Sequence, residues 1–401
     1  MNSQALKKFL VFIVFLNIIF ISVLVDFFRI GSNSHLRYLN LIQNLFMLVA
    51  LVLVLEFIFQ LIYLIKRKNL YAKVSFTNFR NMYVITHPYF PWAYKTNSIT
   101  SKADVLNYPL HKGKFQSAVH KTNFLGFVDG QDGTRQIELL KRIGQVRIAC
   151  LGASTTANYI SERGEIFSYP SELEKILTTR KSDFQVINCA SGGHNSAELL
   201  IRFALQVIDL KPDFIIIYHG YNDIRSYLTP GIKADYSHSR RSIGEVYWKY
   251  YLASAIPTFG LNSLNFLIRK YLVSNVRNSL LDQVSKGVVD LAVNPAIGLE
   301  IYRRNLQSVI SLAKSHNIEV ILSTFCHYLH KDIQKDETHL KYHEIVGQEN
   351  KIIRELSKIN GVQLVDNAVN FPYSDDLFVD SIHFTPKGMK QLAKSFSEII
   401  E

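Results

Sequence analysis

The sequence predicts an α/β protein with a parallel sheet, preceded by two membrane-spanning helices. From about residue 144, short apolar runs of strand type alternate with stretches of helical periodicity. This alternation is typical of parallel α/β sheets. Two long apolar runs stand near the N-terminus. The hydrophobic fraction of 48% over 401 residues excludes a chain that is disordered over most of its length.

The two apolar runs cover residues 9–28 and 41–65. Each reaches the length of about 20 residues that a helix needs to cross the hydrocarbon layer of a membrane. We therefore predict a transmembrane hairpin over residues 1–68, with a loop at 29–40. A buried core helix is one alternative. A cleaved signal peptide is another for the first run, although no small-residue cleavage site follows it.

The positive charge of the chain is concentrated beside these runs. The formal net charge is +12, and residues 1–80 hold nine Lys and Arg against Asp26 and Glu56. Because no nucleic-acid recognition motif accompanies the charge, it indicates a lipid bilayer as partner and not nucleic acid. The flanks of the runs are more basic than the loop between them, which favours a cytoplasmic position for both flanks.

The rest of the chain divides into two parts. Residues 69–143 are expected to form a connecting region with short β elements, and residues 144–401 to form the α/β domain. The strand candidates of this domain are residues 146–151, 184–189, 214–218, 320–323 and 362–365. The helix candidates are residues 168–180, 196–210, 298–316, 337–358 and 386–400.

An insertion, residues 224–297, interrupts the alternation after the third strand candidate and is rich in tyrosine and basic residues. The carboxyl ends of strands are where α/β proteins build their sites. The insertion is therefore expected either to cover the substrate as a lid or to form a surface subdomain without substrate contact.

Three short motifs follow the first three strand candidates. The run GASTT presents Ser154 on a tight turn, SGGHN (191–195) contains Gly193, and HGYND (219–223) contains Asn222. A glycine can expose its backbone N–H to a ligand, and an asparagine can direct its side-chain amide at an anion. Taken alone, the first motif could equally bind phosphate or cap a helix, the second could be a simple strand-to-helix turn, and the third could be a turn with an Asx hydrogen bond.

A fourth motif, DSIHFTPKG, precedes the last helix candidate and contains Asp380 and His383. An aspartate three residues before a histidine can accept from the imidazole Nδ1–H, which leaves Nε2 free as a base. The carboxyl ends of parallel strands meet at one edge, so the four motifs are expected to converge in one crevice. Together they supply the nucleophile, oxyanion donors, acid and base that acyl transfer needs.

The four motifs resemble the four blocks of the SGNH/GDSL hydrolases over about residues 144–401, apart from the insertion. Gly192 is an alternative to Gly193 in this register, and Ala153 replaces the family's Asp, which is a common variation. More loosely, residues 87–89 (HPY) and 123–127 (NFLGF) resemble bacterial membrane-tethered members of the family.

This resemblance implies a flavodoxin-like three-layer α/β/α sandwich and a Ser-His-Asp mechanism without metal or organic cofactor. Ser154 is the implied nucleophile, His383 its base, and Asp380 the group that orients the imidazole. The backbone N–H groups of Ser154 and Gly193, with the side-chain amide of Asn222, are the implied oxyanion hole.

We therefore expect a membrane-anchored serine esterase or deacylase. Its expected substrate is an acyl ester, with acetyl as the expected group, on a carbohydrate, a glycan precursor or a lipid. The alternatives are an O-acyltransferase that uses the same triad and a non-catalytic membrane-tethered binding protein. No metal site is expected, because the spacing around Cys326 and the nearby histidines is unlike a closed zinc site.

The expected location is the bacterial inner membrane. The charge pattern favours a cytoplasmic domain, whereas the tethered relatives favour the extracytoplasmic side. The oligomeric state is left open by the sequence.

Overall fold

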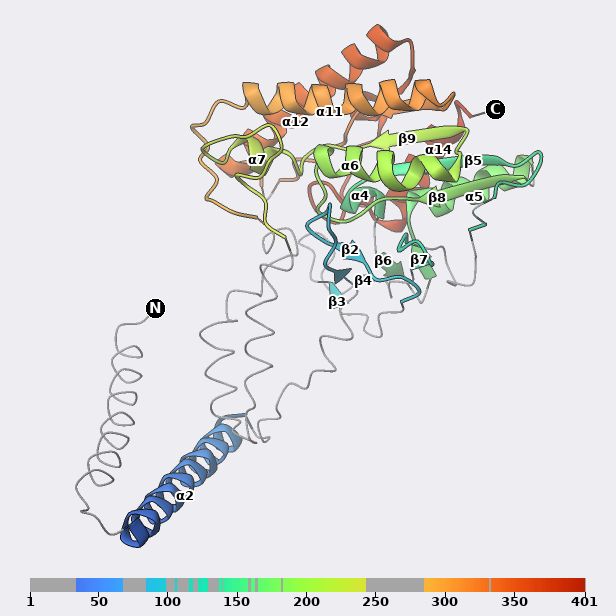
Figure 1. Ribbon diagram of the computed structural model, residues 1–401. Coiled ribbons are helices and arrows are strands. Elements are labelled where there is room, and N and C mark those ends of the chain that lie inside the picture. The colour runs from blue at the N-terminus through green and yellow to red at the C-terminus, as the bar shows by residue number, and fades with distance from the viewer. Residues whose placement is uncertain are drawn as a thin grey trace. The chain divides into compact units, whose positions relative to one another are not determined.

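The computed structural model describes residues 34–67, 84–98, 105–106, 115–117, 122–128, 137–138, 140–157, 160–162, 165–181, 183–242, 285–331 and 333–400. These residues belong to two compact units (Figure 1). One contains helix α2 (Ser34–Arg67), and the other contains all remaining described residues. The predicted span at 9–28 and most of the insertion, residues 243–284, lie outside the described residues.

Helix α2 is long and apolar enough to cross a membrane. Its candidate span, Leu41–Ile65, has 25 residues and a mean hydropathy of 2.8. Its large apolar side chains are exposed, with Phe46 at 75%. The prediction of a loop up to residue 40 is wrong, because the helix already begins at Ser34. No glycine or proline stands between Ser34 and the apolar run, so nothing in the sequence stops the helix earlier.

The second unit is built on a five-stranded parallel sheet in the order β11-β10-β9-β5-β8. Each strand candidate is confirmed to within about two residues. The strands are β5 (Val146–Gly152), β8 (Phe184–Asn188), β9 (Phe214–Tyr218), β10 (Glu319–Ser323) and β11 (Gln363–Val365). In chain order this is 2-1-3-4-5, the flavodoxin-like arrangement, whose ligands bind outside the carboxyl ends of the strands.

Helices cover both faces of this sheet (Figure 1). Helix α5 packs against α14, whereas α11 packs against α6 and α12. Right-handed crossovers explain this pairing. The step from β5 to β8 leads toward one edge of the sheet, whereas the steps from β8 to β9, β10 and β11 lead toward the other edge. Crossovers in opposite directions place their helices on opposite faces. The helices are α5 (Tyr169–Arg180), α6 (Ser196–Arg202), α11 (Ala296–Ser315), α12 (Glu337–Asn360) and α14 (Pro386–Ser397).

The helix predicted at 196–210 is not uniform. After α6 it continues as a π-helical turn, η1 (Phe203–Val207), and a 3-10 turn, η2 (Ile208–Leu210). Lys211 then adopts a left-handed conformation with φ 49°. The following Pro212 disfavours helical geometry in the residue before it, which explains the end of the helix there.

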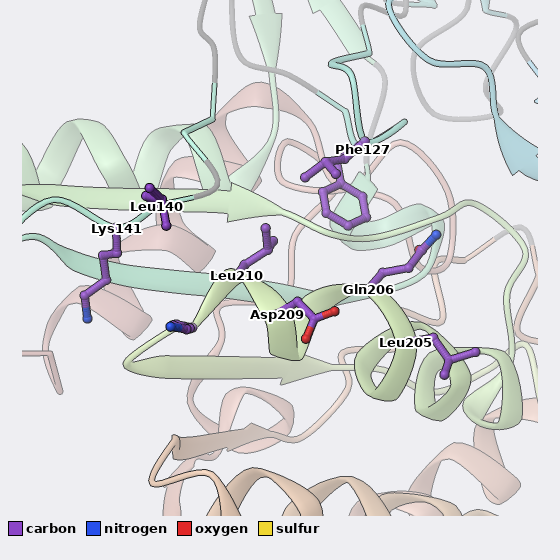
Figure 2. Close-up of a pocket in the computed structure, with 9 residues that line it drawn as sticks. Phe127, Leu140, Lys141, Leu205, Gln206, Asp209 and Leu210 are labelled. Carbon is purple, nitrogen blue, oxygen red and sulfur yellow. The ribbon is translucent and has the colours of Figure 1, made fainter.

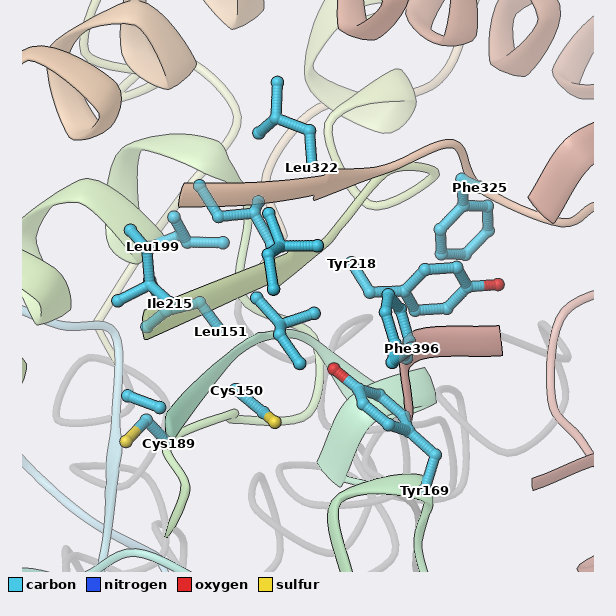
Figure 3. Close-up of a cluster of buried hydrophobic side chains, with 14 of the residues drawn as sticks. Cys150, Leu151, Tyr169, Cys189, Leu199, Ile215, Tyr218, Leu322, Phe325 and Phe396 are labelled. Atoms are coloured by element: carbon cyan, nitrogen blue, oxygen red, sulfur yellow. The ribbon is translucent and has the colours of Figure 1, made fainter. Parts of the chain in front are cut away.

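The hydrophobic core lies on both sides of the sheet. Aromatic side chains pack together in one part of it (Figure 3). Tyr218 on β9 stacks on Phe325 with ring centroids 5.0 Å apart, and Tyr169 packs against Phe396 of α14. Burial of such a side chain contributes roughly 1.5–3 kcal/mol. Cys150, at 0% exposure, is buried in the same core, and burial raises the pKa of its thiol far above neutrality.

Short strands gather on one side of this body (Figure 1). Strands β1 (Val84–Ile85) and β2 (Ala93–Tyr94) form an antiparallel pair. A second antiparallel sheet has the order β3-β4-β6-β7. Its strands are β3 (Val105–Leu106), β4 (Phe115–Ser117), β6 (Ile160–Glu162) and β7 (Glu165–Phe167). The β6–β7 hairpin, which follows the Ser154 motif directly, was not predicted.

Candidate active site

Ser154 stands at the sharp turn between β5 and the short helix α4 (Ser154–Ala157). Gly152 makes the turn possible, because a Cβ there would lie 2.1 Å from Thr156 Oγ1 and 2.5 Å from the Tyr218 carbonyl oxygen. No larger residue fits beside the neighbouring strand. The turn leaves Ser154 partly exposed at the carboxyl edge of the sheet.

The structure brings His383 and Asp380 to this serine. The His383 Nε2 atom lies 2.9 Å from Ser154 Oγ, and its Nδ1 atom lies 2.8 Å from Asp380 Oδ2. The other carboxylate oxygen, Oδ1, accepts from the backbone N–H groups of His383 and Ile382 at 2.8 and 2.9 Å. The predicted Asp-His-Ser sequence of contacts is therefore continuous.

Asp380 and His383 each shift the pKa of the other toward its charged form. Burial acts to lower the pKa of His383, but the charge and hydrogen bond of Asp380 outweigh it, and the net pKa lies above 6.5. Burial acts to raise the pKa of Asp380, but His383 and the two backbone N–H donors hold it below 3.8. Near neutral pH the carboxylate is therefore ionised and can stabilise an imidazolium.

Three candidate donors lie on turns that follow the carboxyl ends of β5, β8 and β9. Within the described residues, the backbone N–H groups of Ser154 and Gly193 donate to no other group. The Asn222 amide donates one hydrogen to the His194 carbonyl oxygen at 2.9 Å, and its second hydrogen has no acceptor among the described residues. Gly192 is a poorer candidate than Gly193, because its N–H already donates to the Tyr94 hydroxyl at 2.9 Å.

The loop that carries Asn222 is supported by two buried carboxylates. Asp223 accepts from Ser196 N at 3.0 Å and contacts His219 Nε2 at 2.9 Å. Tyr221, held at the unusual φ of 68°, donates its N–H to Glu349 Oε2 at 3.1 Å. Burial and the nearby Asp223 carboxylate raise the pKa of Glu349 to about 8.

Sequence reasoning missed Glu349. It lies on the buried face of α12 together with Ile345, Val346, Ile352 and Ile353. A glutamate at that position of the helical period departs from the apolar pattern, and this departure is the signal that could have identified it.

The connecting region also contributes to the site. The His194 ring packs edge-on against Trp92, with centroids 4.9 Å apart, and its Nε2 atom lies 3.3 Å from the Trp92 carbonyl oxygen. Tyr94 holds Gly192, as described above. The turn at Asn123–Phe127 lies next to these residues, since a Cβ on Gly126 would be 2.8 Å from the Tyr94 carbonyl oxygen. The 123–127 motif thus lies beside Tyr94, whereas His87 of the other motif is linked to His194 through Phe90, which packs against both rings.

The cysteine and histidines considered as a metal cluster do not come together. Cys326 Sγ donates to the Asn367 carbonyl oxygen at 3.5 Å. His327 and His343 form a separate pair, with their Nδ1 atoms 2.9 Å apart. Among the described residues, no group of three or more His, Cys, Asp or Glu is arranged to hold a metal ion.

A pocket of about 500 Å³ lies elsewhere in the unit (Figure 2). Phe127, Leu205 and Leu210 contribute to its apolar lining, and Lys141 and Asp209 contribute charges. None of the predicted site residues lines it. It is therefore not the crevice at which the four motifs meet.

The comparisons with solved structures give similarities of low identity. An acetylxylan esterase from Geobacillus stearothermophilus is 17% identical, with 65% of this chain and 98% of that one covered and a TM-score of 0.39. A GDSL-like lipase from Parabacteroides merdae is 16% identical, with coverages of 66% and 98% and a TM-score of 0.39.

No curated protein sequence matches the chain. Residues 150–391, more than half of the chain, match the family model of the GDSL-like lipase/acylhydrolases. This stretch contains all four motifs, from Ser154 to His383. The chain therefore belongs to the GDSL-like lipase/acylhydrolase family and is an ester hydrolase.

Proposed function

We propose that this hydrolase is a serine esterase in which Ser154 is the nucleophile, His383 the general base and Asp380 the orienting acid. The observation that carries the proposal is the unbroken contact from Asp380 Oδ2 through both imidazole nitrogens to Ser154 Oγ, at 2.8 and 2.9 Å. Both distances are within the range required of a nucleophile and its base.

The steps follow from this geometry. Ser154 Oγ attacks the ester carbonyl carbon while His383 Nε2 takes the hydroxyl proton. The carbonyl oxygen becomes an oxyanion and accepts from Ser154 N–H, Gly193 N–H and the free Asn222 amide hydrogen. The intermediate then expels the alcohol, which receives the proton from His383. A water molecule, deprotonated by His383, then attacks the acyl carbon. The bond to Ser154 Oγ breaks, the carboxylic acid leaves, and His383 returns the proton to Ser154 Oγ.

We further propose that α2 tethers the enzyme to a membrane. Its exposed apolar span of 25 residues supports this. A tethered esterase acts on substrates that are held near the same surface. An acyl ester, with acetyl as the expected group, on a glycan, a glycan precursor or a lipid fits that requirement.

Labelling with a fluorophosphonate tests the proposal, because this reagent phosphonylates only activated serines. The detergent-solubilised protein should be labelled, and Ser154→Ala should not. Ser311→Ala, which removes an exposed hydroxyl on α11, is the matched control and should be labelled like the wild type. Labelling of folded Ser154→Ala, or none of folded wild type, would contradict the proposal.

The same samples can be tested for turnover. Release of acetate from an acetylated oligosaccharide, and its loss in Ser154→Ala, would support hydrolysis. Transfer of the acetyl group to a sugar hydroxyl, without free acetate, would identify an O-acyltransferase with the same triad instead.

A further inference from the structure

The turn between β8 and α6 is here called the oxyanion turn, residues 191–195. It contains two adjacent glycines, and Gly193 has φ 74°. Because neither glycine has a Cβ, the peptide group between them, which carries the Gly193 N–H, could rotate at little energetic cost. Its orientation decides whether that N–H points at the oxyanion.

The peptide groups on both sides of this one are held. On one side, the Gly192 N–H donates to the Tyr94 hydroxyl at 2.9 Å. On the other side, the Gly193 carbonyl oxygen accepts from Arg240 Nη2 at 2.7 Å. The peptide group that carries the Gly193 N–H is thus confined from both ends.

Arg240 also holds the far end of the turn through Glu198. Its Nε donates to Glu198 Oε1 at 2.9 Å, and its Nη2 contacts Oε2. The same Oε2 accepts the backbone N–H of Asn195 at 2.7 Å. The Arg240 and Glu198 side chains are only 10% and 7% exposed. Because little water screens these two charges from each other, the attraction between them is stronger than in a solvent-exposed pair.

Arg240 is itself fixed at the base of the insertion. Its backbone N–H donates to the Tyr236 carbonyl oxygen at 3.1 Å, and its backbone forms an antiparallel bridge with Ser285, which also lies within the insertion. Its guanidinium lies 5.8 Å from the centre of the Trp92 ring. A planar guanidinium can satisfy a carboxylate and a carbonyl at once, which suits this position.

We propose that Arg240 is a positioning residue for catalysis, and that it holds the oxyanion turn so that the Gly193 N–H faces the developing oxyanion. This rests on the proposed function of the site. Arg240 acts through Gly193 and does not touch the reacting atoms. Its loss therefore weakens binding of the transition state more than binding of the substrate.

The test is the kinetics of Arg240→Ala with a soluble aryl acetate. We expect kcat to fall by up to about 10²-fold, near the effect of losing one oxyanion donor, with little change in KM. Affinity for a boronic acid, which binds the serine as a tetrahedral adduct, should fall in parallel with kcat/KM. Millimolar guanidinium chloride should restore part of kcat, whereas sodium chloride should not.

Arg241→Ala is the matched control. Arg241 donates to the Ser285 carbonyl oxygen at 2.6 Å and, among the described residues, forms no hydrogen bond with the oxyanion turn, so kcat should not change. Arg240→Met combined with Glu198→Gln leaves no buried unpaired carboxylate. This double variant should stay folded and still lose kcat.

An unchanged kcat in the folded double variant would overturn the proposal, as would equal losses in Arg240→Ala and Arg241→Ala. Failure of the serine mechanism is a separate result, because it would be seen as turnover in Ser154→Ala. If Ser154→Ala is inactive while the Arg240 variants are fully active, only the positioning role is rejected.

Discussion

The acid–base half and the oxyanion half of the candidate site are held in different ways. Asp380 and His383 lie on one turn of chain, and the turn's own backbone N–H groups position the carboxylate. The oxyanion half depends on distant segments. Gly192 is held from 98 residues away by Tyr94, and Tyr221 from 128 residues away by Glu349.

This difference has a functional consequence. In the local half, each side chain takes part directly in the proposed chemistry, so its removal should be severe. In the distant half, several contacts share the task of orienting the donors, so removal of one contact should have a graded effect. Four substitutions, taken from the largest expected effect to the smallest, test this comparison.

Asp380→Asn should have the largest effect. It removes the group that raises the pKa of His383 and that fixes its tautomer, and it should lower kcat by about 10⁴-fold. His383 must be neutral to act as a base, so wild-type activity should rise with pH through a pKa above 6.5.

In the Asp380→Asn variant only burial remains to shift this pKa, and burial lowers it. The acidic limb of the kcat/KM profile should therefore move to lower pH. The measurement is the pH–rate profile of both proteins. An acidic limb at the wild-type position would contradict the assigned pairing.

Asn222→Ala should lower kcat by about 10²- to 10³-fold, since it removes one oxyanion donor. Steady-state kinetics with an aryl acetate measures this effect, and KM should change little. Asn370→Ala, at an exposed position, is the matched control. A decrease in kcat of less than threefold would argue that the Asn222 amide only donates to the His194 carbonyl oxygen and does not bind the oxyanion.

Tyr94→Phe should lower kcat by roughly 2- to 10-fold, the equivalent of one hydrogen bond of about 0.5–1.5 kcal/mol. The ring remains, but the acceptor for Gly192 N–H is lost. Tyr89→Phe is the control, because Tyr89 is 63% exposed. If Tyr94 and Arg240 confine the same peptide group, the double variant Tyr94→Phe/Arg240→Ala should lose more kcat than the product of the two single losses.

Glu349→Gln should change activity least but should change the pH dependence of stability. The pKa of Glu349 is raised from 4.5 to about 8 in the folded protein. Below 4.5 both states hold the proton, and between 4.5 and about 8 only the folded state keeps it. Folding stability from this group is therefore lost as pH rises through that window.

Glutamine resembles the protonated acid and cannot ionise. Thermal unfolding across the same pH window should show a smaller decline for Glu349→Gln than for the wild type. Equal slopes would show that Glu349 titrates as an ordinary carboxyl group.

The sequence predicted the parts of this protein that depend on local pattern. The five strands follow from short apolar runs, and α5, α11, α12 and α14 follow from helical periodicity. Ser154, Gly193, Asn222, Asp380 and His383 were found because each lies within a short motif next to a strand or helix end. The structure brings them to one sheet edge, and their roles stay predictions until the variants are measured.

Only the tertiary structure decided which groups hold these residues in place. Tyr94, Arg240 and Glu349 belong to none of the motifs, although each contacts a backbone atom of the turn that it supports. Backbone N–H and C=O groups are invisible to residue patterns, and folding alone determines which side chain meets them. The same reason explains why, within the described part of the chain, the N–H of Gly193 has no acceptor whereas that of Gly192 donates to Tyr94. The proposed nucleophile and base could therefore be predicted from short motifs, whereas the support of the oxyanion turn could not.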